Sequence, residues 1–138
     1  ENHFGHQEVV RVNYDKNEIN FQDILRLYLR NIDPLDDGGQ FCDRGDSYIP
    51  VIFFENEEEE NQSRDALLSA SNELKIPLKK IKVALKPKSE FWIAEDYHQN
   101  FADNNELKYK FYRFTCGRDQ KLDQLWGDNA RSIDYWNE

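Results

Sequence analysis

The sequence of 138 residues contains no methionine, two cysteines, three histidines and no long apolar run. A helix that crosses a bilayer needs about 20 apolar residues, so no membrane-spanning segment is expected. Cys42 and Cys116 are too few for a disulfide scaffold. They leave open one structural bridge, two buried thiols or part of a redox relay. No histidine lies at ligand spacing with either cysteine, which argues against zinc, and we expect no metal.

Positive charge is also scarce, because 18 Lys and Arg residues stand against 27 Asp and Glu residues, for a net charge of −9. This balance argues against nucleic acid and anionic membrane surfaces as partners. Aromatic residues are abundant, at 14% of the chain within a hydrophobic fraction of 38%. The composition therefore predicts a globular protein, and the length predicts a single domain over residues 1–138, with residues 104–138 as its tail.

The hydrophobic pattern alternates between strand and helix. Residues 7–14, rich in β-branched side chains, predict a strand. Asn20 is a good N-cap, with Asp23 completing a capping box, and apolar residues at helical spacing predict a helix to about residue 31 that Asp33-Pro34 ends. Further along we expect a strand at 48–54, a helix whose first turn is the acidic run 55–60, a strand at 81–85, and helices at 94–101 and 120–126.

This β-α-β-α-β order with an irregular C-terminal third predicts an α+β fold, a ferredoxin-like α/β sandwich in which two helices cover a small mixed sheet. A sheet of three strands is small, and the valines of the strand predicted at 7–14 need packing partners on both faces of it. The chain also opens on Glu1 rather than on an initiator methionine. We therefore expect that one or more strands and a helix ahead of residue 1 complete the fold.

The segment Gly38-Gly-Gln-Phe-Cys-Asp-Arg-Gly-Asp-Ser-Tyr48 carries the densest chemistry. It places a thiol, carboxylates, a guanidinium and a phenol between three glycines, which allow backbone to approach a ligand closely. Asp and Gly are equally typical of ordinary turns. One hypothesis is therefore an acidic structural domain in which this segment is only a connection.

Three stretches taken together resemble the A-type peptide methionine sulfoxide reductases. They are Gly5-His6-Gln7-Glu8 before a strand, the loop with Asp33-Pro34, Gln40 and Asp43-x-Gly45-x-x-Tyr48, and Ala94-Glu-Asp-Tyr-His-Gln99. The ending resembles one subgroup of that family, through Tyr112-Arg-Phe-Thr-Cys-Gly-Arg-Asp-Gln120 and Leu125-Trp126-Gly127. The nucleophilic Gly-Cys-Phe-Trp segment of the family does not occur in these 138 residues, and Ile49-Pro50 stands where the family usually has Arg followed by Ser or Thr. We expect the C-terminal portion of a reductase, with the nucleophilic cysteine upstream.

The resemblance implies that methionine-S-sulfoxide, free or in proteins and peptides, is reduced to methionine by a thiol mechanism without a cofactor. It assigns Glu8 as the proton donor to the sulfoxide oxygen, and Tyr48 as a hydrogen-bond donor to the same atom. Asp43 would orient a water or the tyrosine, and all three would contact substrate. Glutamate has a reference pKa of about 4.3, so an acid at pH 7 must be buried.

After attack on the sulfoxide, the nucleophile becomes a sulfenic acid that a second thiol must resolve. Cys116 is the first candidate for this recycling cysteine, and Cys42, beside Asp43, is the rival; for each, the alternative is a buried inert thiol. The resemblance implies a thioredoxin-like reductant for the resulting disulfide. We expect a cytoplasmic monomer that is inactive as these 138 residues alone. A second hypothesis is a non-catalytic module that binds methionine or its sulfoxide.

Overall fold

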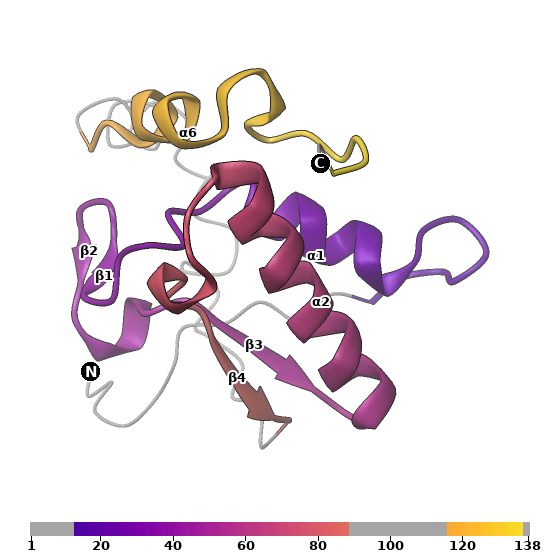
Figure 1. The fold of residues 1–138 in the computed structure, drawn as a ribbon. Helices are drawn as coiled ribbons and strands as arrows, with labels where there is room; N and C mark the ends of the chain where they lie inside the picture. Colours follow the sequence, from indigo (N-terminus) through magenta and orange to yellow (C-terminus); the bar gives the residue numbers. More distant parts are fainter. Residues whose placement is uncertain (1–12, 89–115, 137–138) are drawn as a thin grey trace, which may run out of the picture.

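The computed structural model describes residues 13–88 and 116–136, which form a mixed α+β arrangement (Figure 1). The helices of this part are α1 (Phe21–Leu29), α2 (Glu57–Leu74) and α6 (Arg118–Trp126). Its strands are β1 (Gly39–Gln40), β2 (Asp43–Arg44), β3 (Val51–Phe54) and β4 (Ala84–Pro87). The predicted strand at 7–14, except for its last two residues, and the predicted helix at 94–101 lie outside the described residues. A single domain over the whole chain stays a prediction.

The start of α1 follows the capping box read from the sequence. The Asp23 N–H donates to the Asn20 side-chain oxygen over 2.8 Å, and the Asn20 N–H donates to the Asp23 carboxylate over 3.4 Å. The helix ends at Leu29, about two residues earlier than predicted. The N–H groups of Asn31 and Ile32 then bond to the carbonyls of Tyr28 and Leu29, three positions back. The chain therefore tightens before Asp33-Pro34.

The acidic run opens α2 as predicted. Asn56 is the N-cap and accepts a hydrogen bond from the Glu59 N–H over 2.8 Å, while four glutamates occupy the first turn, where negative charge opposes the helix dipole. Glu60 pairs with Arg64 one turn later, at 2.6 Å. The opposite face carries the apolar residues Ala66, Leu67 and Ala70, which pack in the core.

The two strand predictions that fall within the described residues, at 48–54 and 81–85, were right in kind but wrong in their bounds. Residues Asp46–Tyr48 form a short 3₁₀ turn, and β3 begins only after Pro50, which lacks the N–H that a ladder needs. β4 likewise begins at Ala84 rather than at residue 81. β3 and β4 pair in parallel, with Ile52 opposite Leu85, whereas β1 and β2 form a separate antiparallel hairpin. The described strands thus make two small sheets, and a ferredoxin-like sandwich stays a prediction.

The hydrophobic core draws on both described parts of the chain. Its buried members are Leu25, Leu29, Ile32, Ile52, Ala66, Leu67, Ala70, Val83, Leu122 and Trp126. The last two come from α6, and the Trp126 indole N–H donates to the Ile32 carbonyl over 3.1 Å. The helix predicted at 120–126 is therefore present; it begins two residues earlier than expected and belongs to the core. No helix in the described ranges has the length and apolar character of a membrane span.

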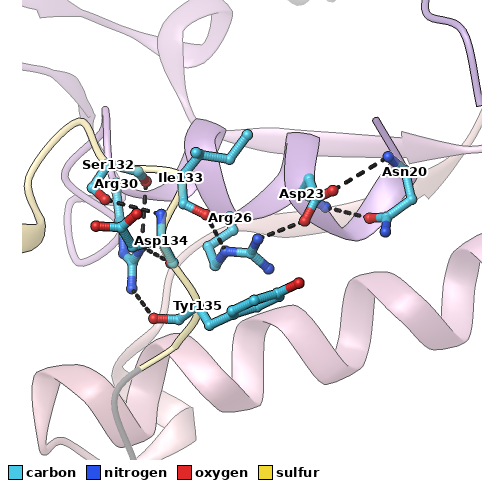
Figure 2. Close-up of polar contacts among 8 residues, drawn as sticks. All are labelled: Asn20, Asp23, Arg26, Arg30, Ser132, Ile133, Asp134 and Tyr135. Carbon is cyan, nitrogen blue, oxygen red and sulfur yellow. Dashed lines mark hydrogen bonds and ion pairs between the residues drawn. The ribbon is translucent and has the colours of Figure 1, made fainter. Parts of the chain in front are cut away.

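A buried arginine directly after α1 joins the C-terminal segment to α2, and Figure 2 shows its contacts with the C-terminal segment. The Arg30 side chain is 0% exposed, and its Nη2 lies 2.6 Å from Oε1 of Glu73 in α2. The same guanidinium donates to the backbone carbonyls of Ser132, Asp134 and Tyr135. A buried charge is tolerated only when it is paired and its remaining donors are bonded, and Arg30 meets both conditions.

Arg26, one turn earlier on α1, holds the same segment from its other side. Its Nε donates to the Ile133 carbonyl over 2.9 Å, its Nη2 lies 2.5 Å from the Asp23 carboxylate, and its guanidinium stacks over the Tyr135 ring (Figure 2). The chain after α6 is therefore fixed along α1 by two guanidinium groups.

We predict that Glu73→Gln destabilises the protein by about 3–5 kcal/mol, because it leaves the Arg30 charge buried without its carboxylate. Glu60→Gln is the matched control: its ion pair with Arg64 is partly exposed, so the expected loss is below about 1 kcal/mol. Chemical denaturation of both variants measures the difference. Equal losses of unfolding free energy would contradict a larger contribution from the buried pair than from the exposed one.

Candidate functional site

The Gln40 side chain fixes the glycine-rich loop to the corner that follows α1. Its amide oxygen accepts the Asp33 N–H over 2.9 Å, and its amide nitrogen donates to the Asp33 carbonyl over 2.7 Å. The Asp33 carboxylate in turn accepts the Leu35 N–H over 3.0 Å. The paired bonds thus join two residues of the loop motif that lie seven positions apart.

An ion pair closes the same loop from the outside. Arg44 donates to both Asp36 carboxylate oxygens, at 2.6 and 2.9 Å, and the Gly38 N–H also donates to Asp36. The hydrogen bonds from Arg44, above all, lower the pKa of Asp36 below its ordinary value. The carboxylate therefore stays charged, and the loop stays closed, well into the acidic range.

The hairpin of β1 and β2 turns through Phe41 and Cys42. Gly39 has φ +143°, a conformation that L side chains rarely adopt, and Phe41 has φ +54°. A Cβ on Gly39 would collide with the Asp43 carbonyl oxygen and lie 2.8 Å from the Arg44 Cα. Glycine at position 39 is thus required for the close approach of β1 to β2, the strand that carries Asp43.

A disulfide joins the tip of this hairpin to the start of α6. The bond links Cys42 to Cys116 across 74 residues, with their Cα atoms 5.3 Å apart. Cys42 is exposed and Cys116 is half-buried. Of the alternatives that the sequence left open, two separate buried thiols is wrong, and a structural bridge and a redox relay remain.

Both sulfur-bearing residues line an open hollow of about 450 Å³. Its other walls come from the Asp33–Asp36 corner, the hairpin tip and the first turns of α6; they are Asp33, Asp36, Phe41, Gly117, Gln120, Lys121 and Gln124. The described residues contain no group of three or more His, Cys, Asp or Glu side chains that could hold a metal ion.

Charges of both signs lie at the α6 side of the disulfide, with Arg118 and Asp119 in the first turn of α6 and Lys121 on the wall of the hollow. Gly117 is the N-cap of α6, so Cys116 directly precedes the helix N-terminus. Arg118 donates to the Asn31 carbonyl over 2.6 Å and lies over the Phe41 ring at 4.5 Å. Burial raises the pKa of Tyr28 above its ordinary value, and the nearby Arg118 charge opposes that rise.

The predicted site residues lie in three different situations. Glu8 lies outside the described residues, so its meeting with Tyr48 over one hollow stays a prediction. Asp43 and Tyr48 are half-buried in the loop, the first on β2 and the second in the 3₁₀ turn after it. Neither lines the hollow beside the disulfide. Cys42 and Cys116 are bonded to each other.

Sequence reasoning missed Lys121 and Phe41 as walls of the hollow. Phe41 adjoins Cys42 in the sequence, and this position could have indicated it. Lys121 lies one turn of helix beyond Gly117, so a helix that begins directly after Cys116 would have indicated Lys121. The sequence instead predicted that the last helix starts at residue 120. The structure moves that start to Arg118 and so brings the helix N-terminus next to Cys116.

Comparisons with known proteins agree along most of the chain. The family model described as peptide methionine sulfoxide reductase matches residues 1–130. A Rhizobium meliloti (strain 1021) protein named peptide methionine sulfoxide reductase MsrA 2 is 39% identical over 126 residues, which are 91% of this chain and 62% of that protein. A protein of the same name from Caulobacter vibrioides is 42% identical over 123 residues, 89% of this chain and 61% of the relative.

A longer relative, named peptide methionine sulfoxide reductase MsrA/MsrB and found in Vibrio cholerae, is 39% identical over 123 residues. The match covers 89% of this chain and 32% of that protein. The chain thus spans about three fifths of the length of the two MsrA 2 relatives and about a third of this one.

We predict that Gly39→Ala destabilises the hairpin more than Gly45→Ala does. Both glycines have positive φ, so each substitution carries backbone strain of about 1–3 kcal/mol. Only at position 39 does the new methyl meet backbone atoms, which adds about 1–3 kcal/mol of overpacking, whereas nothing lies within 4 Å at position 45. Free energies of unfolding measure both. Equal effects would contradict the close approach at Gly39.

Proposed function

The chain belongs to the peptide methionine sulfoxide reductase family, and from this premise we propose that the full-length protein reduces methionine-S-sulfoxide, free or in peptides, to methionine by a thiol mechanism. The observation that carries the proposal is the family match over residues 1–130, together with relatives of 39% and 42% identity that are named as such reductases. The overall change is the transfer of two electrons from thiols to the sulfoxide, with its oxygen leaving as water.

We place the nucleophilic cysteine in a Gly-Cys-Phe-Trp segment ahead of residue 1. No such motif occurs in the 138 residues. Cys42 and Cys116 are bonded to each other, so neither is a free thiol that could attack a sulfoxide in this state. The chain also spans only about three fifths of the MsrA 2 relatives. These facts together favour a thiolate supplied by an upstream segment.

In this proposal the upstream thiolate attacks the sulfoxide sulfur while Glu8 gives a proton to the sulfoxide oxygen. Tyr48 donates a hydrogen bond to the same oxygen, and Asp43 orients a water or the tyrosine. The bonds between Gln40 and Asp33 support these roles, because they hold rigid the loop that carries both Asp43 and Tyr48. The protonated oxygen leaves as water, and a second water attacks the cysteine sulfur as its bond to the substrate sulfur breaks. Methionine is released, and the nucleophile remains as a sulfenic acid.

We assign Cys42 and Cys116 to the recycling of that sulfenic acid, as a pair rather than as rivals. Their bond supports this role, since both sulfurs already lie at one open hollow. In a reducing cytoplasm, where we place a monomeric protein, disulfides are mostly transient catalytic states. A thioredoxin-like dithiol would then return the pair to its reduced form.

The test is steady-state reduction of methionine-S-sulfoxide by the full-length protein, with dithiothreitol as the reductant. We expect turnover, and we expect that Glu8→Gln lowers kcat by about 100-fold or more while KM changes little, because loss of general-acid catalysis typically costs 10²–10⁴. Glu18→Gln, at an exposed position, is the matched control and should leave both constants unchanged.

The 138-residue chain alone should show no turnover. Turnover by that chain would contradict the upstream nucleophile and indicate Cys42 in its place. A rate unaffected by Glu8→Gln would remove the proton-donor role. Sulfoxide binding without any turnover by the full-length protein would favour a non-catalytic binding module.

A further inference from the structure

The two sulfurs of the Cys42–Cys116 bond lie in different surroundings. Cys42 is exposed at the tip of the β1–β2 hairpin, between Phe41 and Asp43. Cys116 is half-buried and directly precedes the Gly117 N-cap of α6. An attacking thiol therefore reaches the Cys42 sulfur more easily than the Cys116 sulfur.

The same difference sets which sulfur is the better leaving group. A thiolate at Cys116 would lie beside the N-terminus of a nine-residue helix, with Arg118 and Asp119 in its first turn. The shared hollow adds Lys121 and two carboxylates, of which Asp36 is paired with Arg44 and Asp33 accepts the Leu35 N–H. Helix N-termini and neighbouring cations stabilise thiolates. A thiolate at Cys42 would instead stand beside the Asp43 carboxylate in sequence, and the nearby Arg44 guanidinium is engaged by Asp36.

We propose that the Cys42–Cys116 disulfide is an exchange-active couple with a fixed polarity, which an external dithiol protein opens at the Cys42 sulfur and from which Cys116 leaves as a thiolate. The inference deepens the proposed recycling role and rests on it. Exposure and leaving-group stability are independent physical factors, and here both select the same direction of attack.

The exchange balances in two steps. In the first, the thiolate of the dithiol forms a bond to the Cys42 sulfur, and the bond to Cys116 breaks with both of its electrons on Cys116. In the second, the remaining thiolate of the dithiol attacks its own sulfur in the mixed disulfide and releases Cys42. The partner is oxidised to a disulfide by two electrons, and this chain gains two thiols once protons are taken up from water.

The open hollow provides access for that attack. It is lined by both cysteines, by the Phe41 ring and by the polar side chains of Gln120 and Gln124. Such a surface, one aromatic ring beside amide groups, fits an extended peptide segment that carries the attacking thiol. The partner is thus a protein with a solvent-exposed cysteine pair, and its contact surface includes the first turns of α6.

The direction of attack can be read with glutathione as the probe. The oxidised full-length protein is exposed briefly to glutathione, quenched with iodoacetamide, and mapped by peptide mass spectrometry. We expect glutathione on Cys42 and carbamidomethyl on Cys116, in at least about tenfold excess over the reverse pattern. Equal labelling, an excess on Cys116, or no opening of the bond by glutathione would each overturn the inference.

Two sets of variants test the cause of the polarity. Lys121→Gln should slow opening of the bond a few-fold, whereas Lys79→Gln, at an exposed position outside the hollow, should not change the rate. In Cys42→Ser, alkylation of the Cys116 thiol should reach half its maximal rate at a lower pH than alkylation of the Cys42 thiol in Cys116→Ser. The reverse order would contradict the stabilised leaving group.

These outcomes are separable from the proposed function. Turnover with dithiothreitol does not depend on which sulfur a protein partner attacks. A reversed glutathione pattern with normal turnover would therefore remove only the polarity, while the expected pattern without turnover would leave an exchange-active bond in a protein that is not a reductase.

Discussion

The described structure depends on one buried charge, the guanidinium of Arg30. Because an unpaired charge is strongly unfavourable in the core, Arg30 requires the Glu73 carboxylate and a set of backbone carbonyls around it. Those partners come from α2 and from the segment after α6, so one side chain directly after α1 fixes two other parts of the chain. The Arg131 N–H adds a bond of 2.9 Å to the Arg30 carbonyl.

The disulfide and the arginine therefore hold opposite ends of the C-terminal part. At one end Cys116 is bonded to the hairpin, and at the other the chain after Trp126 lies along α1. Closing a 74-residue loop stabilises a protein by about 4 kcal/mol in a chain-entropy account. The contacts of Arg30 and Trp126 are non-covalent and do not involve the sulfurs, so we expect them to keep α6 in place when the bond opens.

Local signals in the sequence predicted local structure well. The capping box of Asn20 and Asp23 and the acidic first turn of α2 each lie within a few residues, and both are present. Strand starts were displaced because the 3₁₀ turn before Pro50 competes with strand geometry over residues that are rich in turn formers.

Pairings between distant residues could not be read in this way. The bond between Cys42 and Cys116 was one of several alternatives, since spacing alone does not say which thiols meet. Arg30 and Glu73 lie 43 positions apart, and charged residues of this kind are usually exposed to solvent. Only the packing of α1 against α2 buries them. The family motifs, in contrast, identified the loop that Gln40 holds in place.

Hydrogen exchange of the α6 amides, compared between the oxidised and the dithiol-reduced protein, tests most directly whether Arg30 rather than the disulfide holds this helix. The expected result is that the amides of Leu122 to Trp126 stay protected after reduction of the Cys42–Cys116 bond, and lose protection in the reduced Glu73→Gln variant. Loss of protection in the reduced wild-type protein would contradict the account, because the disulfide would then be the attachment of α6.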